Sequence, residues 1–147
     1  MPDAERDRDE HGRARQARPR DALGRPLPYD SEGVEPVSEE PLPPEQTLTY
    51  ARQLVDDDRP FAAHEVLEAR WKAGPPEQRD LWQGLAQICV GLTHRLRGNR
   101  VGAVRLVERG QARLEEYAAT GQPTYGLDLT AVSACALHRV RSDSPPE

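Results

Sequence analysis

The sequence predicts an all-α protein, a compact antiparallel bundle of about five helices that follows a disordered N-terminal tail. Three observations support this class. The stretch 45–141 is rich in Ala, Leu, Val, Gln, Arg and Glu, which are mostly good helix formers. Apolar residues recur along it with the 3.6-residue period of a helix. It contains no alternating run of β-branched residues long enough to predict a strand.

The helices are predicted from apolar spacing together with signals at their ends. The second is stopped by Gly74-Pro75, the third by Gly98-Asn99, and the fifth begins after Asp128, a good N-cap. The short connections between them favour antiparallel neighbours. Five helices are expected, over residues 45–57, 60–72, 76–97, 100–118 and 128–141.

A change in composition near residue 44 divides the chain of 147 residues into a tail and one domain. Residues 1–44 are rich in arginine, acidic residues and proline, and they show no hydrophobic period. Such a segment buries too little apolar surface to offset its ordering entropy, so we expect it to be disordered. Residues 45–141 form the helical domain, and residues 142–147 are expected to fray.

Composition also limits the partners and the compartment. The net charge of -5 disfavours nucleic acid, and no apolar run approaches the roughly 18–20 residues of a membrane span. Cys89 and Cys135 have no metal-binding spacing and form no disulfide framework, which favours a reducing cytoplasm. A small molecule, a protein or a second copy of the chain remains as the expected partner.

The stretch 61–71 carries the most specific pattern in the chain. On a helix, Phe61, His64, Glu68 and Trp71 share one face because they are spaced i, i+3, i+7 and i+10, and Glu65 flanks them. An exposed face would gain nothing from the two aromatic rings, and an apolar core face would not normally carry an imidazole and a carboxylate. The pattern therefore predicts a buried or half-buried polar cluster that must find hydrogen-bond partners.

The third helix is expected to supply those partners. Gln83, Gln87 and His94 fall on one stripe of it, and antiparallel pairing would place the two glutamines opposite the imidazole and carboxylate of the second helix. His94 would then lie nearer the start of the second helix. Small residues on the third helix allow a neighbouring helix to approach closely: Gly84, Ala86, Gly91 and Thr93.

Three interpretations of the cluster stay open. In the first, His64, Glu68 and Gln87 form a structural hydrogen-bond network that fixes helix register. In the second, His64 and Glu68 bind zinc or a similar divalent metal with His94 as third ligand, and Glu65 is the catalytic base that deprotonates a metal-bound water. In the third, a metal-free pocket uses His64 or Glu68 for acid–base chemistry or binds a small ligand.

The pattern Phe-x-x-His-Glu-x-x-Glu-x-x-Trp, which begins at Phe61, is followed by Gln-Gly-Leu-Ala-Gln from Gln83, then by His94, Gly98-Asn99 and Gly102-Ala103. Over about residues 46–137 this arrangement resembles the domain-of-unknown-function family numbered 309. The resemblance implies a small, all-helical, cytoplasmic domain of a bacterium or archaeon. It also implies a metal-dependent hydrolase that uses the His-Glu motif. The alternative is a non-enzymatic scaffold or interaction domain whose polar cluster is structural.

A row of arginines marks the fourth helix. Arg105, Arg109 and Arg113 are spaced i, i+4 and i+8, with glutamates between them, and we interpret this row as a solvated helix face. Gly102 and Gly110 lie inside the same helix, where each costs about 1 kcal/mol relative to alanine. A close helix crossing would account for them.

Overall fold

The computed structural model describes residues 40–142, which form five α-helices and one 3-10 turn without a strand. The all-α prediction is confirmed. Residues 1–39 and 143–147, which include most of the predicted disordered tail and frayed end, lie outside the described part. The elements are α1 (Pro44–Asp56), α2 (Pro60–Ala73), η1 (Pro76–Gln78), α3 (Arg79–Leu96), α4 (Arg100–Ala119) and α5 (Leu129–Arg141).

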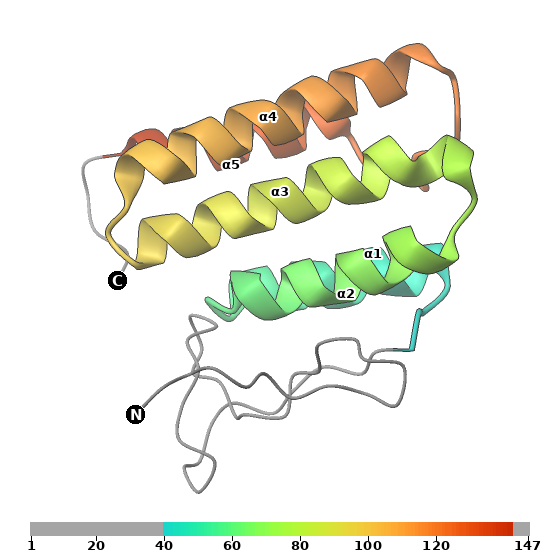
Figure 1. Ribbon diagram of the computed structural model, residues 1–147, viewed down its shortest axis with the longest axis horizontal. Coiled ribbons are helices and arrows are strands. Elements are labelled where there is room, and N and C mark those ends of the chain that lie inside the picture. Colours follow the sequence, from blue (N-terminus) through green and yellow to red (C-terminus); the bar gives the residue numbers. More distant parts are fainter. Residues whose placement is uncertain (1–39, 143–147) are drawn as a thin grey trace, which may run out of the picture.

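Helix α3 runs through the middle of the bundle, with α1 and α2 on one side of it and α4 and α5 on the other (Figure 1). It packs against α2, α4 and α5, while α1 packs on α2 and α5 also packs on α4. Both α2 and α4 are antiparallel to α3, as the short connections predict (Figure 1). The core is built from aliphatic side chains around the fully buried ring of Trp82.

Side chains and prolines fix where the helices begin. Pro44 and Pro60 occupy the first positions of α1 and α2, where a missing N–H costs nothing. The Asn99 side chain accepts a hydrogen bond of 3.0 Å from the Gly102 N–H at the start of α4. Asp128 caps α5 in the same way, by accepting from the Ala131 N–H at 3.0 Å, which confirms its predicted role. The third predicted helix differs at its start, because residues 76–78 form a 3-10 turn after the proline pair.

Helix α1 ends in a left-handed turn that holds aspartate where glycine is usual. Asp58 has a φ of 58°, and its N–H donates to the Val55 carbonyl at 3.0 Å. The Arg59 N–H donates to the Leu54 carbonyl at 2.7 Å, which completes a Schellman motif. Helix α3 ends in a similar turn with Gly98 at a φ of 85°. The left-handed conformation costs more free energy at Asp58 than at Gly98, because only glycine adopts it freely.

The closest helix contact is between α3 and α4. A Cβ atom built on Gly110 would lie 2.6 Å from the Gly84 carbonyl oxygen, and one on Gly91 would lie 2.9 Å from the Ala103 carbonyl oxygen. Neither backbone leaves room for a side chain. The expected close approach to the small residues of the third helix is therefore present at Gly84 and Gly91, and the helix that approaches there is α4.

Within residues 40–142, no helix combines the length and the hydropathy that a bilayer crossing requires.

Candidate functional site

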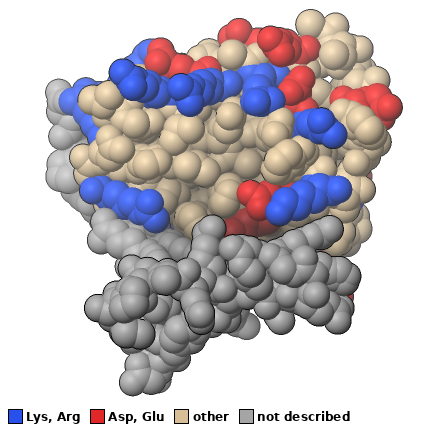
Figure 2. Space-filling view, viewed as in Figure 1, with Lys and Arg blue, Asp and Glu red and all other residues tan. Residues whose placement is uncertain are grey.

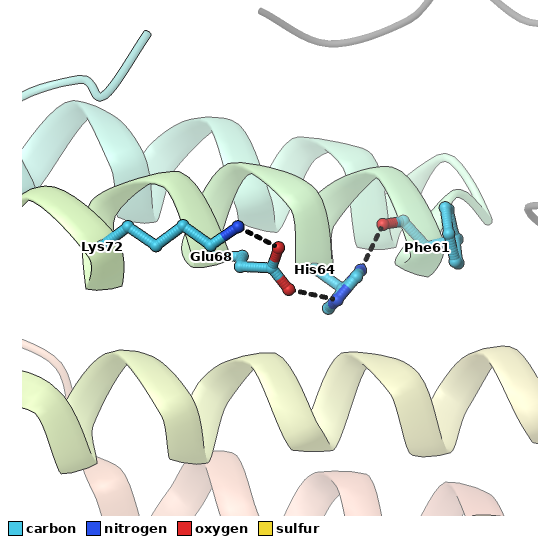
Figure 3. A network of polar contacts seen from close by, with 4 residues as sticks. All are labelled: Phe61, His64, Glu68 and Lys72. Atoms are coloured by element: carbon cyan, nitrogen blue, oxygen red, sulfur yellow. Dashed lines mark hydrogen bonds and ion pairs between the residues drawn. The ribbon is translucent and has the colours of Figure 1, made fainter. Parts of the chain in front are cut away.

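The polar cluster of the motif lies along one side of α2 (Figure 3). The His64 Nε2 and the Glu68 Oε2 are 3.2 Å apart, and the His64 Nδ1 is 3.3 Å from the Phe61 carbonyl oxygen. The other Glu68 oxygen accepts from the Lys72 Nζ at 3.0 Å. Because His64, Glu68 and Lys72 follow one another at intervals of four residues on one helix, their contacts with one another lie within α2.

His64 and Glu68 are half-buried, whereas Lys72 is exposed. The side chains of His64, Glu68 and Lys72 are 19%, 36% and 67% exposed. Burial of the Glu68 carboxylate raises its pKa, but the Lys72 hydrogen bond and the nearby charges of His64 and Lys72 outweigh that effect. The pKa of Glu68 therefore lies below its ordinary value, and the carboxylate is ionised at neutral pH.

The two glutamines of α3 accept hydrogen bonds from a different partner than the one predicted. The Arg113 Nη1 donates to the Gln83 Oε1 at 2.7 Å, and the Arg113 Nε donates to the Gln87 Oε1 at 3.1 Å. The same Nη1 lies 3.1 Å from an oxygen of Asp80. The prediction that these amides face His64 and Glu68 is therefore wrong. They join α3 to α4, because that stripe of α3 turns toward α4.

His94 lies near the end of α3, where the Asn99 amide nitrogen is 3.2 Å from its Nδ1. Among residues 40–142, no three His, Cys, Asp or Glu side chains are grouped closely enough to hold a metal ion. The predicted set of His64, Glu68 and His94 is therefore not assembled. The described residues do not fit a zinc site with three protein ligands.

The remaining motif residues flank the cluster. Phe61 is half-buried, and its ring centroid lies 5.2 Å from that of His64 in a tilted arrangement. Trp71 is half-buried and packs against the core. Glu65, the predicted catalytic base, is half-buried on α2 next to His64 in sequence.

Four polar residues of these contacts lie outside the predicted set: Lys72, Asp80, Asn99 and Arg113. The sequence holds a signal for two of them. Lys72 follows Glu68 by four residues, and Asp80 extends the stripe of Gln83 and Gln87 by three. Arg113 belongs to the row interpreted as solvated, and that interpretation is wrong for this residue because its guanidinium bridges to α3.

A curated relative of this chain is the "Uncharacterized protein YpuF" of Bacillus subtilis (strain 168). It is 46% identical over 48 residues, which make up 32% of this chain and 28% of that protein. The aligned segment thus spans less than a third of the relative's length. No solved structure matches the chain.

The family comparison covers the part of the chain that carries the motif. Residues 48–106, from α1 into α4, match the family model described as "Domain of unknown function (DUF309)". This range is shorter than the 46–137 expected from the motif. The predicted resemblance is confirmed over it: residues 48–106 make this chain similar to the DUF309 family.

Proposed function

We propose that this helical domain acts by binding a partner rather than by catalysis, and that the polar cluster of α2 has a structural role. The observation that carries the proposal is that the polar groups of the cluster pair with one another. Both Glu68 oxygens are engaged, one by His64 at 3.2 Å and one by Lys72 at 3.0 Å. A carboxylate held in this way is poorly placed to take a proton from a substrate, because Lys72 and His64 both favour its ionised form.

The structural role makes a stability prediction. The Glu68→Ala variant loses two i,i+4 pairs, each worth about 0.2–0.5 kcal/mol, so its free energy of unfolding should fall by about 0.5–1 kcal/mol. Urea unfolding of purified protein measures this difference. Glu116→Ala is the control, since it removes an exposed carboxylate from α4. Equal stability of Glu68→Ala and Glu116→Ala would contradict the structural role, because both variants gain the same helix propensity.

Metal-dependent hydrolysis is a second candidate, and one observation favours it. Ligand atoms on zinc lie about 2.0–2.1 Å from the ion. The 3.2 Å between the His64 Nε2 and the Glu68 Oε2 is compatible with a shared ion. Glu65 would then be the base that activates water. The ion would have to displace the Lys72 ammonium from the carboxylate, and it would lack His94 as third ligand.

Metal analysis separates the two candidates. Tag-free protein is purified without chelator, incubated with zinc and desalted, and its metal content is measured beside that of His64→Ala. The hydrolase candidate expects about one ion per chain in the parent and a loss in the variant. The binding proposal expects the same low content in both. We expect the second result, and we place this role in the cytoplasm on the grounds of the cysteine pattern.

A further inference from the structure

A broad surface over α2, α3 and α4 is almost free of charged side chains. Figure 2 shows uncharged residues over the centre of this face and charged residues along its edges. Such a distribution is unusual for a chain in which 31% of residues are charged. Depletion of charge at the centre of a surface with a polar rim is typical of a protein–protein interface.

The uncharged face carries large hydrophobic side chains that are only half-buried. The chain has one phenylalanine and two tryptophans, and both Phe61 and Trp71 lie half-buried on α2 while Trp82 is fully buried. Val90 of α3 and Leu106 of α4 are also half-buried. Burial of these side chains against another molecule would release further hydrophobic free energy.

The face is large enough for a stable association. Helix α3 has 18 residues, which gives a length of about 27 Å. Three helices with axes about 8–10 Å apart are about 28 Å wide. The projected area is therefore about 750 Å², close to the roughly 800 Å² that each partner contributes to a standard interface.

The charges at the two edges favour a second copy of the chain as the partner. Along the α4 edge, Arg105 and Arg109 are exposed. The α2 edge carries Glu68, which is 36% exposed and lies beside the Lys72 ammonium. Because α2 and α4 lie on opposite sides of α3, a two-fold axis in the face and parallel to α3 sets α4 of one copy against α2 of the other (Figure 1).

We propose that the chain forms a two-fold dimer through this uncharged face of α2, α3 and α4, with the α4 arginines of each copy opposite Glu68 of the other. This inference rests on the binding role proposed above and names its partner. The dimer would also change the environment of His64, which is half-buried in the single chain. In the dimer, the His64–Glu68 pair would lose its remaining contact with water between Phe61 and Trp71.

Sedimentation of the full chain tests the dimer. Across about 5–100 μM protein, the parent should have twice the chain mass of 16.4 kDa. Val90→Glu places a charge at the centre of the face and should reduce the mass to that of one chain. Val101→Glu is the matched control, because Val101 is 67% exposed on α4 and should leave the dimer intact. Arg109→Glu should raise the dissociation constant about tenfold, and 0.5 M NaCl should weaken the parent dimer.

Two results would overturn the proposal: a parent that sediments as one chain at 100 μM, or a dimer that survives Val90→Glu. Because Val90 is only half-buried, Val90→Glu should still fold, and its circular dichroism should match that of the parent. The stability role of the cluster is tested separately by combining Glu68→Ala with Val90→Glu and measuring unfolding of the monomer. A loss of stability there supports the structural role even when the dimer fails, and an unchanged stability rejects that role even when the dimer stands.

Discussion

The contact between α3 and α4 predicts the sign of a glycine substitution, which helix propensity alone would give wrongly. Replacement of Gly110 by alanine inside a helix should stabilise it by about 1 kcal/mol when only propensity counts. In this structure the new Cβ would lie 2.6 Å from the Gly84 carbonyl oxygen and 2.8 Å from the Ile88 Cγ1. The nearer atom belongs to backbone, so the two helices themselves must move apart.

The expected magnitude follows from these two opposed effects. Overpacking of a tight contact costs about 1–3 kcal/mol, and separation of the helices also weakens the packing of Leu114, whose Cδ2 lies 2.8 Å from where a Cβ on Gly84 would be. After the propensity gain of about 1 kcal/mol is subtracted, we expect Gly110→Ala to lower stability by up to about 2 kcal/mol. For a domain of this size each kcal/mol corresponds to about 4–8 °C in melting temperature.

Thermal unfolding followed by circular dichroism measures the change, and α4 offers its own control. Ala112 is exposed on the same helix, so Ala112→Gly reports propensity without the contact and should cost about 1 kcal/mol. A Gly110→Ala variant that melts above the parent would refute the claim that the two backbones touch. Equal and opposite shifts for the two substitutions would show that Gly110 has no packing role.

Two further predictions concern a charge and a turn. The pKa of Glu68 in the folded chain lies below its ordinary value of 4.5, so the carboxylate stabilises the fold above that pH and loses its effect as the pH falls through the folded pKa. The gap in melting temperature between the parent and Glu68→Gln should stay constant from pH 7 to about pH 5 and shrink below that; a gap that widens in acid would contradict the assignment. Asp58→Gly should raise stability by about 0.5–1 kcal/mol in urea unfolding, because Asp58 has a φ of 58°, whereas Gly98→Ala should lower it; a loss of stability in Asp58→Gly would show that its carboxylate makes a stronger contact.

The helices of this protein could be predicted from sequence because their signals are local. Apolar spacing, the prolines at the starts of α1 and α2, and the Asp128 cap each act within one turn, and the structure places the helix ends within a few residues of those expected. The 3-10 turn at residues 76–78 was harder to foresee, since a proline pair is compatible with either kind of first turn.

The partners of the polar residues could not be predicted in the same way. The spacing of His64 and Glu68 on one helix fixes their contact, and that part is confirmed at 3.2 Å. The direction of Gln83 and Gln87 depends instead on the rotation of α3 about its axis. That rotation is set by where Gly84 and Gly91 allow α4 to approach. As a result, Gln87 bonds to Arg113 of α4, which is 26 positions away in the sequence.

The two halves of the motif therefore serve two different contacts, and this separation can be measured. Gln87 and Arg113 share a hydrogen bond of 3.1 Å, whereas Gln87 and Glu68 share no partner in the described structure. A double-mutant cycle on Gln87→Ala and Arg113→Ala should give a coupling of at least about 0.5 kcal/mol, and one on Gln87→Ala and Glu68→Ala should be additive within about 0.3–0.5 kcal/mol. A single catalytic centre would couple all three residues. Strong coupling between Gln87 and Glu68 would thus contradict the separation of the two contacts and favour a shared site between α2 and α3.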